Sequence, residues 1–395
     1  MKIAIVMDNM NYGGAQSVCI DYIKILLRLG HEVVFFNLDP QKTEVEKRIP
    51  QKVQIIHYRL SLDDCPSRYY IGIKAYRFGK YAFPFVYILK KVTLSIKKWF
   101  FRAKRHEDYD LAIAFAGHYN DLTFVAENFI SSEKKLCWTH GAIFQNFIAS
   151  DGFLDSYLKI KNIIVLNKMA QEEALASNHF LNLEKKLNIR LLYNPINMEG
   201  KIVDTEKVKN LKSRYGDYVI MVARFSYPHK DQYTVVDAMK VLKEKYGLLK
   251  NVVFLGDGPE RKKVEQYARE VDMYKQCFFV GSHDDVQNYY AAAKMLVHSS
   301  IAFEGFALIL VEAMYYDIPV VSTDTIVGPR EVLGSGKYGL LCNIKDPYMM
   351  ADNIYKLYSD DDAYAHYVSM GKQRREDFTY DKIGAQLSQI IKELL

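Results

Sequence analysis

The stretch Ser299-Ser-Ile-Ala-Phe-Glu-Gly-Phe-Ala-Leu-Ile-Leu-Val-Glu-Ala-Met-Tyr-Tyr-Asp-Ile-Pro319 decides the fold of this chain of 395 residues. The residues Met295–His298 before it and Ile318–Ser322 at its end are typical of buried strands. Gly305 and the apolar run after it predict a turn and a helix between these two strands. A turn of this kind directs backbone N–H groups and a helix N-terminus toward one point, which suits a phosphate group.

Two carboxylates flank this predicted turn and helix. Glu304 comes directly before the glycine, and Glu312 lies about two turns further along the helix. Taken alone, Glu304 is equally well explained as a capping acid of the first helical turn, and Glu312 as a solvated helix residue. The rest of the chain has to decide between these alternatives.

Length and composition narrow the class of protein. A chain of 395 residues with 49% apolar and 25% charged residues favours two globular domains, and a net charge of +6 is too small to indicate nucleic acid. Five scattered cysteines without a CxxC pair favour a reducing compartment and argue against a zinc site. We find no signal peptide and no run near the ~18 apolar residues of a spanning helix, and therefore expect a soluble or peripheral protein.

The chain opens with the pattern of a parallel α/β sheet. Strand Lys2–Met7 is followed by the glycine pair Gly13-Gly14, a helix over Ala15–Leu29 and a strand over His31–Asn37. The glycine pair allows a ligand to approach the backbone closely, or it forms a tight turn and nothing more. A GxGxxG fingerprint and an acidic residue for a ribose are both missing, which weighs against a dehydrogenase.

The strand-and-helix alternation continues through both halves of the chain. Further strands are predicted at Val53–Tyr58, Asp110–Ala116, Lys135–His140, Asn162–Asn167, Ile189–Asn194, Tyr218–Ala223, Asn251–Leu255, Cys277–Val280 and Gly339–Asn343. We therefore predict an α/β protein with one Rossmann-like domain over residues 1–195, a second over 196–375, and a returning helix over 376–395.

A basic aromatic insertion interrupts the first domain at about residues 68–105. It contains eleven Lys or Arg and no Asp or Glu, and Pro84 divides it. Winding the part after Pro84 as a helix gathers apolar side chains in one arc and cations opposite, with Leu94 and Phe101 as exceptions. This pattern is typical of a helix on an anionic membrane surface; the alternative is a helix packed on the domain with a solvated basic face. The candidate membrane or acceptor residues are Lys90, Lys91, Lys97, Lys98, Trp99 and Arg102.

Several polar residues follow predicted strands, where parallel sheets bind ligands. His140 ends one strand of the first domain and is either a ligand-binding or a satisfied structural histidine. In the second domain, Arg224 and Lys230 share one strand-to-helix loop, and two cations placed so would neutralise a diphosphate. Gly256 begins another strand-to-helix turn of the same domain.

The order of these signals resembles the retaining GT-B glycosyltransferases of family four, the glycosyl transferases group 1, over nearly the whole chain. The resemblance implies two Rossmann-like domains with a cleft between them and a C-terminal helix that crosses back. It implies that Glu304 lies beside the transferred sugar, that Glu312 holds the ribose hydroxyls, and that His140 lies near the sugar. It further implies donor contacts from Gly14, Arg224, Lys230, Gly256, Phe306, Ala307, Leu308 and Glu312.

The resemblance implies the transfer of a hexosyl or N-acetylhexosaminyl group from a nucleoside-diphosphate sugar, with UDP as the family-level expectation, to a glycan or lipid-linked acceptor. Neither a metal nor another cofactor is expected, because the two cations and the helix N-terminus take the role of a metal. We expect a cytoplasmic enzyme of bacterial surface polysaccharide synthesis, peripheral at the inner face of the cell membrane. The alternatives are a nucleotide-sugar-binding module without transfer activity, and an epimerase or phosphorylase of the same fold.

Overall fold

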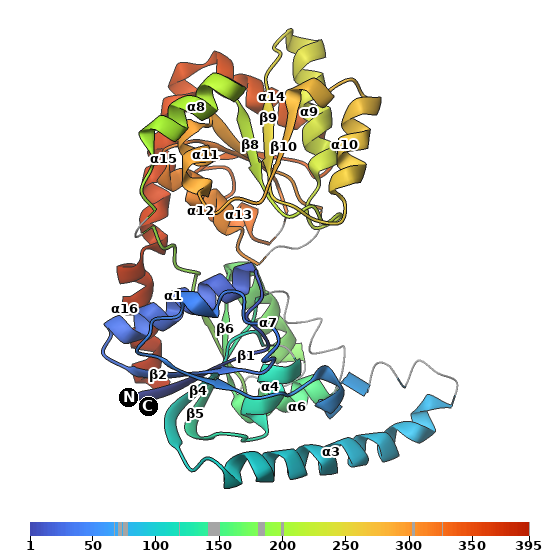
Figure 1. The fold of residues 1–395 in the computed structure, drawn as a ribbon, viewed down its shortest axis with the longest axis vertical. Coiled ribbons are helices and arrows are strands. Elements are labelled where there is room, and N and C mark those ends of the chain that lie inside the picture. The colour runs from blue at the N-terminus through green and yellow to red at the C-terminus, as the bar shows by residue number, and fades with distance from the viewer. Residues whose placement is uncertain are drawn as a thin grey trace. The chain divides into compact units, whose positions relative to one another are not determined.

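The computed structural model describes residues 1–66, 68–69, 73, 78–117, 119–140, 151–180, 186–198, 201–301, 305–325 and 327–394. The chain forms two compact units (Figure 1). The first comprises Met1–Pro195 together with Ile383–Leu395, and the second comprises Ile196–Lys382.

The first unit is built on a seven-stranded parallel sheet in the order β3-β2-β1-β4-β5-β6-β7. Its strands are β1 (Lys2–Met7), β2 (Glu32–Asn37), β3 (Gln54–His57), β4 (Asp108–Ala114), β5 (Ser131–Trp138), β6 (Asn162–Val165) and β7 (Asn188–Leu191). Its helices are α1 (Gly14–Arg28), α3 (Gly79–Ala103), α4 (Tyr119–Ala126), α6 (Asp151–Ile160), α7 (Lys168–Phe180) and most of α16 (Tyr380–Leu394), with short 3-10 turns at Glu46–Arg48 and Leu62–Asp64.

The second unit has a six-stranded parallel sheet in the order β10-β9-β8-β11-β12-β13. Its strands are β8 (Val219–Val222), β9 (Val252–Leu255), β10 (Cys277–Gly281), β11 (Met295–His298), β12 (Val320–Thr323) and β13 (Leu340–Cys342). Its helices are α8 (Thr205–Tyr215), α9 (Gln232–Tyr246), α10 (Arg261–Glu270), α11 (Val286–Ala292), α12 (Leu308–Tyr315), α13 (Pro329–Val332), α14 (Pro347–Ser359) and α15 (Asp361–Arg375), with 3-10 turns at Tyr274–Gln276 and Glu376–Phe378.

The predicted α/β architecture of two parallel sheets is confirmed, and every predicted strand is present, with the predicted bounds at β1 and β11 and with shifted ends at the others. The largest shift is at β5, which begins at Ser131 rather than Lys135. Its first five residues are only partly buried or exposed, so they lack the apolar signal by which a buried strand is found. Buried side chains of the first sheet contribute to an apolar cluster in the first unit, and those of the second sheet contribute to another in the second unit.

The helix α3 differs from the sequence prediction in its start, and its orientation decides between the two readings left open for it. It begins at Gly79 and runs through Pro84 instead of being divided there. Leu94 and Phe101, the exceptions of the predicted apolar arc, are the buried apolar side chains among the described residues of α3, and they pack into the core of the first unit. The apolar arc itself is exposed, so the helix packs on the domain through Leu94 and Phe101 and not through that arc.

Aromatic packing fastens the C-terminal end of α3 to the domain. The Phe101 ring lies 4.8 Å from that of Tyr58 and 5.3 Å from that of Phe124. Two ion pairs add to this contact: Lys91 Nζ lies 2.7 Å from Glu127 Oε1, and Lys97 Nζ lies 2.7 Å from Asp64 Oδ1. Burial raises the pKa of the Glu127 carboxyl, but hydrogen bonds from Lys91 and Lys159 outweigh it and hold that pKa below its ordinary value.

We predict that alanine substitution at two neighbouring phenylalanines of α3 lowers stability by very different amounts. Phe101→Ala removes a buried ring and should destabilise the first unit by about 3 kcal/mol. Phe100→Ala, at a side chain that is 56% exposed, should cost less than about 0.5 kcal/mol. Scanning calorimetry of the whole protein measures both, and equal loss in melting temperature for the two variants contradicts this orientation of the helix.

Candidate functional site

The loop between β8 and α9 occupies the switch point of the second sheet. β8 pairs with β9 on one side and with β11 on the other, so the loops that follow these three strands meet at one edge. The connections diverge between β8 and β11, and open α/β sheets bind their ligands at such a point. The loop carries both predicted diphosphate ligands, Arg224 and Lys230.

Backbone hydrogen bonds hold this loop on both sides. Toward β11, the Asp231 amide donates to the Ser299 carbonyl at 3.0 Å, and the Ile301 amide donates to the Pro228 carbonyl at 3.2 Å. Toward β9, the Phe225 amide donates to the Asp257 carbonyl at 3.0 Å. The loop is therefore fixed against the segment that leads into α12.

The two cations of the loop differ in exposure. Arg224 is exposed and forms no ion pair with any residue that the structure describes, whereas Lys230 is half-buried. Asp231, the carboxylate nearest to Lys230 in the chain, is buried and caps α9 by accepting from the Thr234 amide and hydroxyl. Its oxygens are thus engaged by the helix it begins, and the exposed charge of the loop is positive.

Gly256 has a structural reason to be glycine. Its φ is +138°, and a Cβ placed there would lie 2.2 Å from the Ala223 carbonyl oxygen. The amide of Gly256 also donates to the Gly281 carbonyl at 2.8 Å. The glycine therefore lets the chain after β9 approach the chain after β8, and its contact with a donor stays a prediction.

The N-terminus of α12 follows β11 at the same edge. Ala307 precedes the helix with φ 48° and ψ 58°, a left-handed conformation that costs a residue with a Cβ more than it costs glycine. Phe306 is buried, with its ring 5.1 Å from that of Phe378. Leu308 begins the helix, whose first turn holds no acidic residue. The predicted carboxylate Glu304 lies outside the described residues.

Glu312 is held by side chains from two other segments. Its Oε2 accepts a hydrogen bond of 3.0 Å from the Tyr290 hydroxyl, and its Oε1 lies 3.4 Å from Lys201 Nζ. Tyr290 is buried and its ring stacks on Tyr316, with centroids 5.5 Å apart. Burial, followed by the charge of Glu312, raises the pKa of Tyr290 well above its ordinary value, so the hydroxyl remains a donor.

This arrangement replaces the alternative of a solvated helix residue with a fixed carboxylate. Its contact with ribose hydroxyls stays a prediction. Sequence reasoning missed Tyr290 and Lys201, since they lie 22 and 111 residues from Glu312 and belong to no motif.

The first unit carries the two remaining predicted residues, Gly14 and His140. Gly14 begins α1 directly after β1, at the carboxyl edge of the sheet. A Cβ on Gly14 would meet no atom of the chain within 4 Å, and its φ is not positive. The fold itself therefore does not require glycine at this position, and the contact of Gly14 with a donor stays a prediction.

His140 follows β5 and is bound to the end of the neighbouring strand. Its Nε2 lies 2.8 Å from the Phe115 carbonyl oxygen, and its ring centroid lies 5.3 Å from that of Phe115. Because a carbonyl oxygen only accepts, Nε2 carries a proton. This bond fits the structural alternative for His140, and its place near a sugar stays a prediction.

Comparison with known protein families finds a match within the second unit. Residues 203–376 match the family described as glycosyl transferases group 1. The match lies within the second unit and covers less than half of the chain. The match spans the loop with Arg224 and Lys230, the turn at Gly256 and the helix that bears Glu312, so the family resemblance seen in the sequence is confirmed.

Two curated relatives and one solved structure match nearly the whole chain. An N-acetyl-alpha-D-glucosaminyl L-malate synthase of Bacillus anthracis is 22% identical over 97% of this chain and 94% of the relative. A GalNAc-alpha-(1->4)-GalNAc-alpha-(1->3)-diNAcBac-PP-undecaprenol alpha-1,4-N-acetyl-D-galactosaminyltransferase of Campylobacter jejuni is 21% identical over 100% of this chain and 99% of the relative. The crystal structure of HepE from Anabaena, in complex with UDP and glucose, covers 100% of both chains at 19% identity with a TM-score of 0.74. The fold is therefore GT-B.

Two glycines of the site should respond differently to an added methyl group. Gly14→Ala should leave the melting temperature unchanged within about 2 °C, because its Cβ meets open space. Gly256→Ala should destabilise the second unit by more than about 1 kcal/mol, because its Cβ meets a carbonyl oxygen and the backbone conformation disfavours it. Scanning calorimetry measures the melting temperature of both variants. A large fall in the melting temperature of Gly14→Ala would mean that the fold needs glycine at this position.

Proposed function

We propose that this glycosyltransferase moves a sugar from a UDP-sugar to a hydroxyl group of a glycan or lipid-linked acceptor, with retention of the anomeric configuration, in bacterial surface polysaccharide synthesis. The observation that carries the proposal is the loop between β8 and α9, which sets Arg224 and Lys230 beside the segment leading to the N-terminus of α12. Cations and free N–H groups at one sheet edge are the groups that a diphosphate requires.

UDP is the proposed nucleoside diphosphate. The neighbour HepE is in complex with UDP and glucose, and this chain shares its fold over the full length. On this proposal Arg224 and Lys230 bind the diphosphate, and Gly14, Gly256, Phe306, Ala307 and Leu308 contribute backbone groups to the donor. Glu312 accepts from the ribose hydroxyls, and Glu304 orients the hydroxyls of the transferred sugar.

In the proposed sugar transfer, negative charge develops on the departing diphosphate. The bond between the anomeric carbon and the diphosphate oxygen breaks, and that oxygen keeps the electron pair. Arg224, Lys230 and the N–H groups of α12 stabilise this charge, which is larger in the transition state than in the bound donor. The acceptor oxygen then bonds to the anomeric carbon on the face that the diphosphate left, and the acceptor proton passes to a diphosphate oxygen.

We also propose that the reaction needs no metal ion. The two loop cations and the N-terminus of α12 supply the positive charge that a divalent ion gives in other transferases. Among the residues that the structure describes, no three His, Cys, Asp or Glu side chains gather as metal ligands. Transfer measured with EDTA present tests metal independence separately from donor binding.

The acceptor class rests on the relatives. The Campylobacter jejuni relative is named for a substrate linked through diphosphate to undecaprenol, and the Bacillus anthracis relative is named for L-malate. We favour a lipid-linked acceptor for this chain because of the exposed apolar and basic surface of α3. His140 and Gly14 are the residues of the first unit proposed to lie near the transferred sugar.

Removing the charge of Lys230 or of Glu304 should abolish most transfer. We expect Lys230→Ala and Glu304→Gln each to lower kcat/KM by about 10²–10³ without lowering the melting temperature. Lys262→Ala, at an exposed lysine of α10, is the matched control and should keep full activity. The assay is UDP release from a panel of UDP-sugars with undecaprenyl-diphosphate-linked acceptors, and near-full activity in both variants overturns the site.

Tyr290 should act on donor binding through Glu312. Tyr290→Phe removes one hydrogen bond to that carboxylate, and we expect the KM for the UDP-sugar to rise about three- to tenfold with little change in kcat. The neighbouring Tyr289→Phe is the control, because it removes a comparable hydrogen bond, to His283, on the other side of α11. An equal change in KM for both variants means that Tyr290 has only a structural role.

A further inference from the structure

The helix α3 presents its apolar side chains to solvent. We use apolar stripe for the seven residues that face outward, which are Phe85, Ile88, Leu89, Val92, Ile96, Trp99 and Phe100. Each of these side chains is at least 50% exposed, whereas Leu94 and Phe101 on the opposite side are 3% and 7% exposed. A continuous exposed stripe of this length is uncommon on a monomeric protein and marks an interaction surface.

Cations border the apolar stripe on both sides. The helix contains six Lys or Arg and no Asp or Glu. At 100° per residue, Arg102 falls beyond one edge of the stripe and Lys97 beyond the other, whereas Lys98 and Lys90 lie further round, nearer to the buried side with Leu94. Arg102 is exposed, and the three lysines are half-buried. Lys98 and Arg102 form no ion pair with any residue that the structure describes, so their charge is available to a partner.

The neighbouring edge of the first sheet extends this positive charge. A hollow of about 470 Å³ at the amino ends of β5, β6 and β7 is lined by Lys134, Lys135, Lys159, Lys161 and Arg190, with Glu133 and Glu393 as its acids. Burial, together with the nearby charges of Lys159 and Lys98, lowers the pKa of Lys135 despite the opposing charge of Glu127. Lys98 of α3 is therefore close enough to this edge for its charge to act on Lys135.

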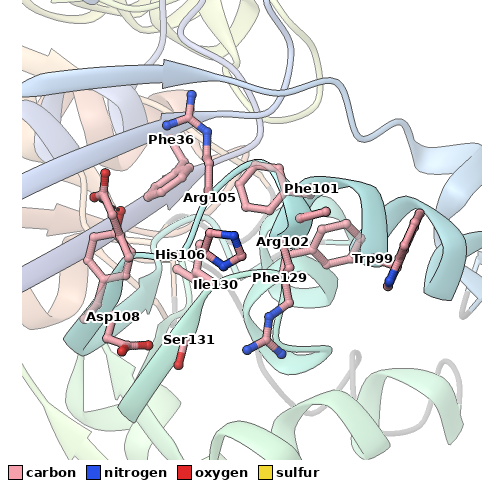
Figure 2. A pocket seen from close by; sticks show the side chains of 13 residues that line it. Phe36, Trp99, Phe101, Arg102, Arg105, His106, Asp108, Phe129, Ile130 and Ser131 are labelled. Carbon is pink, nitrogen blue, oxygen red and sulfur yellow. Dashed lines mark hydrogen bonds between the residues drawn. The ribbon is translucent and has the colours of Figure 1, made fainter.

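A second cavity, of about 580 Å³, opens beside the C-terminal end of α3 and the first residues of β4 and β5 (Figure 2). It lies at the amino edge of the sheet, away from the carboxyl edge that carries Gly14 and His140. Figure 2 shows Arg102, Arg105 and His106 around this cavity, together with Trp99. Glu107 and Asp108 also line it, and Glu107 is paired with Lys2 at 3.0 Å.

We propose that α3 lies in the plane of an anionic lipid bilayer, with the apolar stripe among the acyl chains and its flanking cations at the level of the lipid phosphates. Long Lys and Arg side chains beside an inserted stripe reach outward to the lipid headgroups. Trp99 suits the boundary between the headgroups and the acyl chains. The buried side of the helix, with Leu94 and Phe101, remains packed on the domain.

Charge complementarity favours a membrane over a second copy of the chain. Two copies of α3 packed stripe to stripe would bring their lysines and arginines together, in either direction, because the helix contains no carboxylate to pair with them. Anionic lipids supply that missing negative charge at about 1 kcal/mol per cation near the surface. No helix among the described residues is long and apolar enough to cross a bilayer, so the contact proposed here is in-plane.

The inference rests on α3 and is independent of the proposed glycosyl transfer. Flotation of the whole protein with vesicles needs neither donor nor acceptor, so its failure leaves the transferase proposal standing. Vesicles of phosphatidylcholine with phosphatidylglycerol provide the anionic surface, and pure phosphatidylcholine provides the neutral comparison. We expect binding to the anionic vesicles and at least tenfold weaker binding to the neutral ones.

Two sets of variants test the stripe and its flanks. Ile88→Ser with Val92→Ser and Ile96→Ser should weaken vesicle binding by at least tenfold, whereas Leu249→Ser with Ile344→Ser and Met349→Ser, at exposed apolar residues of the second unit, should not. Lys98→Glu with Arg102→Glu should weaken it by at least about 25-fold, at about fivefold per cation removed. Lys209→Glu with Lys262→Glu, at exposed lysines of the second unit, is the matched control.

Lys91 and Lys97 are left intact in these variants because they hold α3 to the domain through Glu127 and Asp64. Calorimetry on each variant checks that the fold is kept. Absence of wild-type binding to anionic vesicles, equal binding to neutral ones, or full binding by the stripe variant each overturns the proposal. A lipid-free dimer that the stripe variant converts to a monomer, measured by light scattering, also overturns it in favour of a second copy as the occupant.

Discussion

The loop between β8 and α9 is tied by backbone hydrogen bonds to the segments after β9 and after β11, and the second unit's site depends on this constraint. The bond from the Asp231 amide to the Ser299 carbonyl fixes the end of the loop that bears Lys230. The bond from the Phe225 amide to the Asp257 carbonyl fixes the end that bears Arg224, and Gly256 leaves the space for it. The loop thus holds its two cations in place at one sheet edge. A diphosphate that binds there would not have to rearrange the loop first.

Much of the fold could be predicted from the sequence because buried parallel strands are short apolar runs that end at glycine or polar residues. Both sheets and the order of Arg224, Gly256 and α12 follow from that pattern. The orientation of α3 could not be predicted, because periodicity identifies an apolar arc without showing which side the domain covers. Two residues outside the arc, Leu94 and Phe101, decide it through contacts with side chains distant in the sequence. The hydrogen bond from Tyr290 to Glu312 was missed for the same reason.

Positive groups that we propose to bind phosphates lie at two places in the chain, and different structures hold them. On the second unit they are few and fixed, since Arg224 and Lys230 lie on a loop that backbone bonds restrain. On the first unit they are more numerous, since the helix α3 alone contains six Lys or Arg and no Asp or Glu. The first arrangement suits one diphosphate in one geometry, and the second suits a surface of many lipid phosphates. We infer that one chain binds both a nucleoside diphosphate and a membrane surface. A lipid-linked acceptor would explain why one enzyme needs both.

Metal-free binding of UDP by the second unit is the central claim, and its most direct test is a thermal-shift titration in EDTA. UDP, GDP and ADP are compared on the wild type, on Lys230→Ala and on Lys262→Ala. The account predicts that UDP raises the melting temperature of the wild type and of Lys262→Ala in proportion to its concentration, and that Lys230→Ala loses most of this rise. No rise with any of the three nucleotides, or an equal rise with UDP in Lys230→Ala, would contradict the account.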